Sequence, residues 1–234
     1  MTTSDASARK LSTLLKRLRT QYATQAAGMT LPETWGNFDP AVHQVVYSML
    51  LWEASSTQAR TAHHRLREHL VDYNELRVCM PDEIAHIIGE KYPRSTERAL
   101  RLRSILADVF RKVHQLSLAH LASLPKREAR AFLDSLDGMP RSVASRVMLL
   151  TLEGHATPCD DRLRDLLVQE RVIPAEMAAD AAGSWLEHHI RAEDATLAYA
   201  VLQAWSDDVG GVVRVAKHAK KTARPAKSKA RPGA

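Results

Sequence analysis

The sequence contains little cysteine and no long apolar run. Its 234 residues include two cysteines, Cys79 and Cys159, which lie far apart in the chain. Two thiols exclude a disulfide framework and a four-cysteine zinc or iron–sulfur site within this chain, and such sparing use of cysteine is typical of a reducing compartment. The apolar runs are too short to span a bilayer, and the polar start "MTTSDASARK" lacks the features of a secretory signal. We therefore expect a cytoplasmic protein with no membrane partner and no metal or other cofactor.

Aromatic residues are also few, at 5% of the chain, and no segment shows the period-two alternation of a half-buried strand. Apolar residues recur instead at helical spacing, for example at Leu11, Leu14, Leu15 and Leu18. Trp52 lies in another such segment and is interpreted as a core residue. Turn residues separate these segments at short intervals. The sequence therefore predicts an all-α fold of about ten helices.

Capping residues predict where some helices begin. Asp39 followed by Pro40 is expected to start one helix, because aspartate accepts hydrogen bonds from the first N–H groups and proline suits the first turn. Ser56 or Thr57 is expected to cap the next helix. Ser95 is expected to cap a long basic helix over "RSTERALRLRSILADVFRKVHQL".

The positive charge is concentrated at the C-terminal end. The net charge of the chain is +6, but its last 21 residues carry eight Lys and Arg and no acidic residue, so residues 1–213 carry a net charge of −2. A segment this rich in lysine, alanine and proline cannot bury apolar surface, and residues 214–234 are predicted to form a disordered basic tail. The charge favours nucleic acid as the partner of the tail, with improved solubility as the alternative role.

The stretch "LDGMPRSVASRVM", residues 136–148, places a glycine turn between two helix-like segments. A turn of this kind can point backbone N–H groups outward at the start of the second helix, where they bind phosphate. This is the logic of the helix-hairpin-helix motif, whose usual form is L-P-G-V-G-R-x-T-A. The matching residues are Leu136, Gly138, Met139, Arg141 and Ala144.

Pro140 stands where that motif has its second glycine. Proline has no N–H to offer, so one phosphate contact is lost and the hairpin should bind DNA less tightly than a standard one. From this stretch alone, a plain helical corner with a glycine cap is an equal alternative.

A second segment favours the hairpin. Eighteen residues after Ser142 the chain reaches Asp160, at a helix start within "HATPCDDRLRDLL". The chain resembles the endonuclease III-like DNA glycosylases of the HhH-GPD superfamily, in which the hairpin is followed by a loop of the form G-x-x-x-x-x-V-D-T-H and then a helix. Upstream, "LLWEASSTQARTA" and "IIGEKYPRSTERALRLRSIL" are similar to two further segments of that family. The four segments span roughly residues 45–170.

The resemblance implies two helical lobes around a cleft that receives a flipped nucleotide. We expect one domain over residues 1–213, with a central six-helix lobe over about 57–156 that contains the hairpin. The second lobe would consist of residues 1–56 and 157–213. The family's C-terminal four-cysteine cluster is absent, and the basic tail stands in its place. DNA is the implied partner of a monomeric protein, nucleoid-associated if it is bacterial.

Asp160 matches the essential aspartate of the family. The resemblance implies that its carboxylate stabilises the positive charge that develops on the sugar as the base leaves. The alternative role is that of a helix N-cap, which Asp161 could equally fill.

Ser142 matches the lysine with which some family members form a Schiff base and cut the strand. A hydroxyl cannot form an imine, so lyase chemistry of that type should be absent. The adenine-mismatch glycosylases also have "RS" at this point, which fits a water-using mechanism. Their catalytic glutamate aligns near Leu51, so Glu53 is a candidate substitute acid, and an exposed glutamate on a helix face is the alternative.

The remaining candidates would contact DNA. Ser55 aligns near the family's glutamine wedge, which fills the gap left by the flipped base, but its side chain is too short to do that well. Tyr92 and Arg94 could form a second insertion loop in which Tyr92 stacks, with a tyrosine in a surface turn as the alternative. The full set of expected DNA contacts is Gly138, Met139, Arg141, Ser142, Ser55, Thr57, Gln58, Tyr92, Arg94, Lys217, Lys220 and Lys221.

Three functional hypotheses follow. The first is a monofunctional DNA glycosylase of base-excision repair, which hydrolyses the bond to a damaged or mispaired base. The second is a non-catalytic DNA-binding protein of the same fold, which Pro140 and Ser55 favour. The third is a helical protein-interaction module with no role on nucleic acid.

Overall fold

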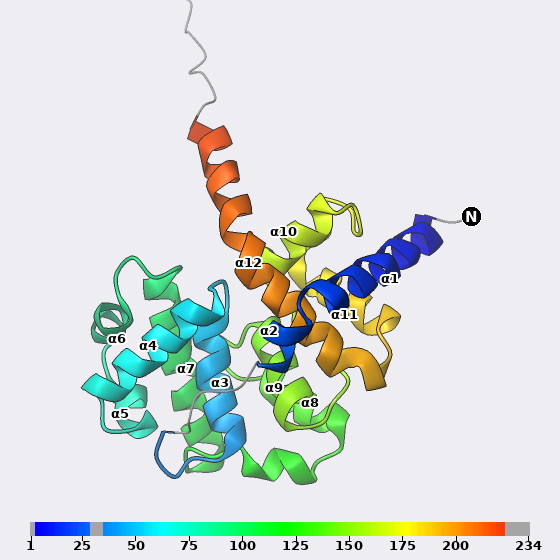
Figure 1. The fold of residues 1–234 in the computed structure, drawn as a ribbon. Helices are drawn as coiled ribbons and strands as arrows, with labels where there is room; N and C mark the ends of the chain where they lie inside the picture. The colour runs from blue at the N-terminus through cyan, green and yellow to red at the C-terminus, as the bar shows by residue number, and fades with distance from the viewer. Residues whose placement is uncertain (1–2, 29–34, 223–234) are drawn as a thin grey trace, which may run out of the picture.

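The computed structural model describes residues 3–28 and 35–222, with side chains for residues 6–28 and 35–209. This part of the chain contains twelve α-helices, two short 3-10 helices and no strand, which confirms the predicted all-α class (Figure 1). No helix within it is long and apolar enough to span a bilayer. In chain order the α-helices are α1 Thr3–Gln21, α2 Ala23–Ala27, α3 Pro40–Leu51, α4 Ser56–His69, α5 Tyr73–Val78, α6 Pro81–Ile88, α7 Ser95–Val113, α8 Lys126–Asp134, α9 Arg141–Thr151, α10 Asp161–Gln169, α11 Ala179–His189 and α12 Ala195–Thr222.

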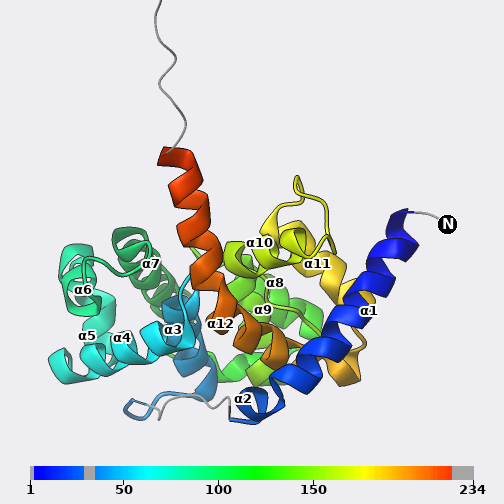
Figure 2. The same cartoon turned by 45° about the horizontal axis from the view of Figure 1, so that its top comes forward.

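The helices form two groups that meet at α3 and α9 (Figures 1 and 2). Helices α4 to α7 lie on one side, and α1, α2, α10 and α11 lie on the other. α3 packs on α9, α4 and α7, whereas α12 packs on α1, α2, α9 and α10. The two helical lobes are thus present, while the exact lobe boundaries at residues 57 and 156 stay a prediction.

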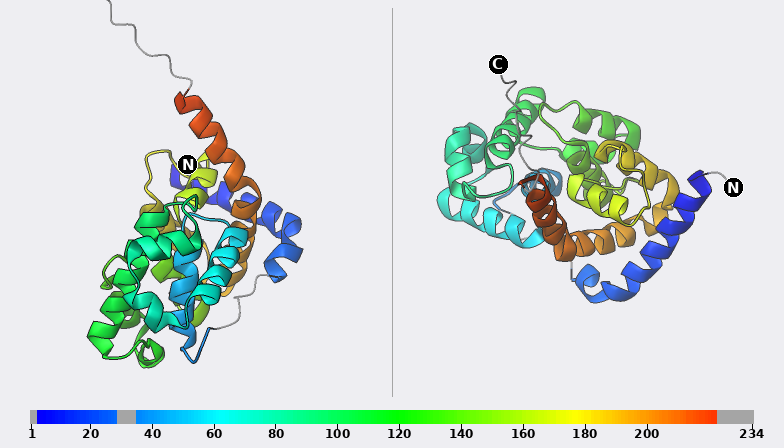
Figure 3. Two further views of the ribbon diagram at one scale, coloured as in Figure 1. Left: turned by 90° about the vertical axis from the view of Figure 1, so that its left-hand side faces the viewer. Right: turned by 90° about the horizontal axis from the view of Figure 1, so that it is seen from above.

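Helix α12 continues into the basic segment. The C-terminal part of this helix projects from the body (Figure 3). The backbone of residues 214–222, the first part of the predicted tail, is helical and continuous with α12. Residues 223–234 lie outside the described part of the chain.

The start of α3 is capped as the sequence predicts. Asp39 Oδ1 accepts hydrogen bonds from the N–H groups of Ala41 and Val42, and Pro40 is the first helical residue. Asp39 Oδ2 also accepts from Leu118 N at 2.9 Å, so the same carboxylate ties α3 to a distant loop.

Two other predicted caps are wrong by one residue. Ser55, not Ser56 or Thr57, caps α4, because its hydroxyl accepts from the N–H three residues later. Arg94 occupies the N-cap position of α7, and Ser95 is already helical, with its hydroxyl donating to a carbonyl of α6. Where hydroxyl residues are adjacent in the sequence, either can cap the helix, and the packing of the helix decides which one does.

The predicted glycine turn joins α8 to α9. Gly138 has φ +81°, a conformation that favours glycine, and Arg101 on α7 donates from Nη1 to its carbonyl at 3.1 Å. A Cβ at Gly138 would lie 3.3 Å from Arg101 Cα. The turn therefore requires glycine both for its backbone conformation and for the close approach of α7.

We expect Gly138→Ala to lower the free energy of unfolding by about 1–2 kcal/mol, because alanine is strained at positive φ. Gly28→Ala is a matched control, since Gly28 has φ −84° and its Cβ would meet no atom closer than 3.5 Å. Urea titrations of the two variants check this. Equal stability of both variants would contradict the expectation.

Candidate functional site

Asp160 is the N-cap of α10. Its Oδ1 accepts a hydrogen bond from Leu163 N at 3.0 Å, and its Oδ2 accepts one from Glu53 N at 3.0 Å. The capping role therefore belongs to Asp160 and not to Asp161. The two backbone donors fix the orientation of the carboxylate at the positive end of a helix.

Glu53 lies beside Asp160. Its side chain is only 1% exposed, and Oε1 accepts from Asp161 N at 2.7 Å. The alternative of an exposed glutamate on a helix face is therefore wrong. Helix α3 ends at Leu51, and the backbone of Glu53 turns with φ +59°, which is consistent with its carboxylate meeting the start of α10.

Arg98 on α7 closes the opposite side of this junction. Its guanidinium is fully buried and donates to the carbonyls of Met49, Leu50 and Trp52 at the end of α3, and to that of Pro93. Burial lowers the pKa of Arg98 to about 10, although the negative charges of Glu53 and Asp160 oppose this shift. A cation thus binds the negative end of α3, while two carboxylates occupy the positive end of α10.

An open recess of about 370 Å³ lies in front of Asp160. Its walls come from the end of α3, the hairpin, the start of α10 and the segment that leads into α11. The hairpin contributes Met139, Pro140, Arg141 and Ser142. The structure therefore brings Asp160, Glu53 and Ser142, the three predicted catalytic positions, to one recess.

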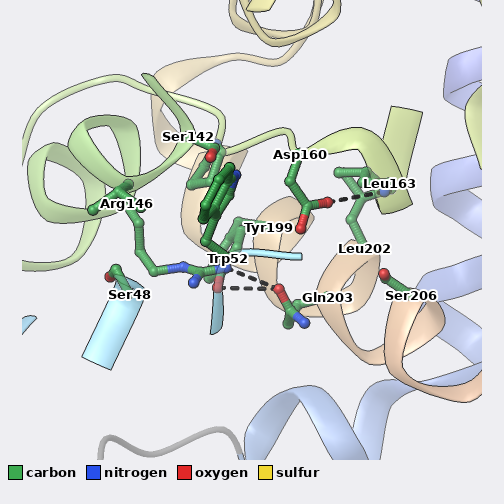
Figure 4. A pocket seen from close by; sticks show the side chains of 12 residues that line it. Ser48, Trp52, Ser142, Arg146, Asp160, Leu163, Tyr199, Leu202, Gln203 and Ser206 are labelled. Atoms are coloured by element: carbon green, nitrogen blue, oxygen red, sulfur yellow. Dashed lines mark hydrogen bonds between the residues drawn. The ribbon is translucent and has the colours of Figure 1, made fainter. Parts of the chain in front are cut away.

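A second, smaller cavity of about 20 Å³ lies beside the recess, with room for about one water molecule, and Figure 4 shows the side chains that line it. Trp52, Ser142 and Asp160 line both spaces. The remaining lining residues are Ser48, Val143, Arg146, Pro158, Leu163, Tyr199, Leu202, Gln203 and Ser206.

The hairpin presents the first turn of α9 to the recess. Pro140 occupies the N-cap position, and no side chain caps this helix. Its first N–H groups belong to Arg141 and Ser142, and the first turn of an α-helix has no intrahelical acceptor for such groups. The Arg141 side chain donates to Ser184 Oγ on α11 at 3.0 Å, which connects the hairpin to the opposite wall.

The upstream candidates lie elsewhere. Ser55 and Gln58 bond to each other in a capping box, with Ser55 N donating to Gln58 Oε1 at 2.9 Å. Thr57 lines a separate recess of about 320 Å³, together with Ser56 and Arg60. None of these residues lines the recess in front of Asp160.

The predicted insertion loop packs against the junction. Tyr92 is half-buried, its hydroxyl donates to Leu50 O at 2.7 Å, and burial raises its pKa to about 12. Arg94 is exposed and forms an ion pair with Asp161 at 3.6 Å, with its guanidinium 5.2 Å from the Trp52 ring. Arg94 thus reaches the rim of the recess, whereas the Tyr92 hydroxyl is bound within the protein.

The tail candidates Lys217, Lys220 and Lys221 lie beyond the residues whose side chains the structure describes. Within the described residues, no three His, Cys, Asp or Glu side chains cluster as metal ligands would.

Sequence reasoning missed three residues at this site. Trp52 is half-buried and packs against the core, as expected, but it also lines both spaces, which the sequence did not indicate. Arg146 lies four residues after Ser142 on α9, and this spacing places both on one helix face. The spacing alone could have indicated that Arg146 lies near the site. Gln203 comes from α12, and nothing in the sequence connects it to the hairpin.

No protein-family model and no curated protein matches the sequence. Solved structures match by fold. A trapped endonuclease III–DNA covalent intermediate has a TM-score of 0.62 at 12% identity, over 87% of this chain and 85% of that chain. An 8-oxoguanine glycosylase/lyase from Clostridium acetobutylicum, in complex with DNA, has a TM-score of 0.62 at 12% identity, over 88% and 71%. A 3-methyladenine DNA glycosylase from H. pylori, bound to 1,N6-ethenoadenine, has a TM-score of 0.55 at 13% identity, over 90% and 98%. The chain therefore has the same all-α fold as these DNA glycosylase structures, which is the fold that the resemblance of its sequence segments predicted.

Proposed function

We propose that this protein is a monofunctional DNA glycosylase, which binds duplex DNA and hydrolyses the N-glycosidic bond of a damaged or mispaired base. The observation that carries the proposal is the position of Asp160, whose carboxylate faces an open recess that the hairpin also lines. The structures of similar fold, several of them bound to DNA, support DNA as the partner.

In the proposed reaction, Asp160 acts through its charge. The sugar becomes cationic as the bond to the base breaks, and a preorganised anion stabilises that transition state. The hydrogen bonds from Leu163 N and Glu53 N hold the carboxylate in place, so little reorganisation is needed. The Glu53 carboxylate is bound to Asp161 N, which favours a positioning role over that of a general acid.

The first turn of α9 would bind a DNA phosphate, since its free N–H groups and the helix dipole favour an anion. The hydroxyl of Ser142 would lie where a lyase has its amine. Water would add to the sugar C1′ as the bond from C1′ to the base breaks, and the departing base would take up the proton that the water loses.

A second candidate function is lesion-indifferent DNA binding without catalysis. The observation that favours it is the size of the cavity behind Trp52, which at about 20 Å³ admits no base while the indole holds its present position.

We expect Asp160→Asn to lower the rate of base excision by at least about 100-fold, because the transition-state cation loses its counter-charge. Asparagine can keep the cap bond from Leu163 N, but its NH2 group would then face Glu53 N, so a urea titration of the variant accompanies the assay and shows whether the fold persists. Asp161→Asn, the adjacent carboxylate in the same recess, is the control and should keep its rate within about threefold. The assay uses duplexes that carry uracil, alkylated, oxidised or mismatched bases. Unaltered excision by Asp160→Asn would reject the proposed role.

Lyase chemistry through an imine should be absent. Incubation with an abasic duplex and borohydride is expected to yield no covalent protein–DNA complex, because Ser142 offers no amine. A trapped complex would show that another amine attacks the sugar, and the enzyme would then not be monofunctional.

Removal of residues 214–234 should weaken binding to damaged and undamaged duplexes by the same factor, and should reduce the slope of log K against log salt, because eight positive charges are lost. Titrations at several salt concentrations check this. If the shortened protein keeps a preference for a lesion, the glycosylase proposal is favoured. If all affinity disappears with the tail, lesion-indifferent binding becomes the better account.

A further inference from the structure

Trp52 lines both the recess and the small cavity, and its side chain lies beside Ser142 (Figure 4). Among the described residues its indole N–H has no hydrogen-bond partner. The guanidinium groups of Arg94, Arg98 and Arg101 lie 5.2, 5.7 and 5.2 Å from the ring. Packing and these cation–π contacts hold the ring, while Arg98 binds the backbone carbonyl. None of the hydrogen bonds that hold the junction of α3 and α10 involves the indole, so a rotation of the ring would break none of them.

A buried guanidinium lies behind the indole. Arg146 is 8% exposed, and its Nη2 donates to Gln203 Oε1 at 2.9 Å. Its Nε is buried without a hydrogen-bond partner, and no carboxylate of the described residues forms an ion pair with it. A buried cation without a counter-charge is unfavourable unless another group accepts from it. The Arg146 side chain lines the small cavity, so an acceptor that entered this space would come next to the guanidinium.

The surroundings of Arg146 are rigid. Gln203 Nε2 donates to Asp207 Oδ1 at 3.0 Å, and the same oxygen accepts from Ser56 N at the start of α4. This chain of bonds fixes the amide of Gln203 so that its oxygen faces Arg146. The ring of Tyr199 lies 5.1 Å from the guanidinium. The donors of Arg146 are thus presented in one fixed orientation.

Arg162 provides a useful contrast. It is also buried and its Nε also lacks a partner, but its Nη2 donates to Ser206 O at 2.8 Å and its side chain does not line the cavity. Burial of an arginine alone therefore does not indicate a ligand site here. What distinguishes Arg146 is the empty space in front of its guanidinium, next to Asp160.

We propose that the space behind Trp52 is the base pocket, opened by rotation of the indole, and that Arg146 selects bases with a carbonyl oxygen on the edge that enters. This inference rests on the proposed glycosylase function. With the sugar at Asp160, a base that extends away from the recess meets Trp52 first and Arg146 behind it. A guanidinium only donates hydrogen bonds, so it binds a carbonyl oxygen, which has two lone pairs, better than the ring nitrogens of an adenine-derived base, which have one each.

The test measures binding, so that it does not depend on excision. Duplexes carry one 2′-fluoro nucleotide, which resists hydrolysis, with uracil, 8-oxoguanine or 1,N6-ethenoadenine as its base. Fluorescence anisotropy gives the affinity of the full-length protein for each. We expect uracil or 8-oxoguanine to bind at least about tenfold tighter than 1,N6-ethenoadenine.

Arg146→Met should abolish this preference, because methionine offers no hydrogen-bond donor to a carbonyl oxygen. Arg162→Met, which removes another buried guanidinium, is the matched control and should retain the preference. Arg146→Lys keeps the charge and part of the donor capacity, and should retain a reduced preference. If Arg146→Met fails to fold, the base preference of Arg146→Lys decides the test.

Trp52→Ala should speed association with the carbonyl-bearing duplexes and keep the preference for them, because the pocket is then already open. If Trp52→Ala loses the preference while Arg146→Met keeps it, the base stacks on the indole in the recess and the inference is wrong.

Two further outcomes separate this inference from the proposed function. A base preference that survives Arg146→Met, or that favours 1,N6-ethenoadenine, overturns the role of Arg146 and leaves the glycosylase proposal intact. If neither the natural protein nor Trp52→Ala prefers any of the bases, the proposal of a base pocket behind Trp52 is also wrong. The proposed function is then decided separately, by excision in the natural protein and its loss in Asp160→Asn.

Discussion

Two crossed hydrogen bonds hold the end of α3 against the start of α10. The N–H of Glu53 donates to Asp160, and the N–H of Asp161 donates to Glu53. Arg98 binds the carbonyls at the end of α3 from the other side. Each charge lies at the helix end whose dipole stabilises it, so the junction favours its own charges. Because the carboxylate of Asp160 takes part in this junction, its position depends on the packing of both lobes.

Helix α3 transmits this arrangement to the hairpin. It packs along α9, whose first turn carries Ser142, and it ends at Trp52, which lines the recess. Arg101 on α7 reaches the same hairpin and bonds to the carbonyl of Gly138. A shift of α3 along α9 would therefore move the hairpin and the carboxylate relative to each other, and the recess would lose its shape.

The features predicted correctly from the sequence are local ones. Asp39 and Gly138 satisfy backbone requirements within a few residues, and Asp160 follows the hairpin at a spacing that resembles a family. The exposed position considered for Glu53 was wrong because the chain turns sharply after α3, where Glu53 adopts positive φ, while its catalytic role stays a prediction. No pattern of neighbouring residues indicates that turn, since Arg98 on α7 binds the carbonyl of Trp52 and the N–H of Asp161 on α10 binds the carboxylate of Glu53.

A closed pocket also explains how selectivity can arise from few contacts. In the proposed mechanism a flipped base must displace Trp52, which loses its packing and its cation–π contacts with three arginines. Only a base that forms new hydrogen bonds with Arg146 offsets that loss. A base without a suitable acceptor leaves the guanidinium unsatisfied and stays in the duplex, where stacking and pairing hold it. Displacing the indole would thus cost the same free energy for every base, while hydrogen bonding to the Arg146 guanidinium would discriminate between bases.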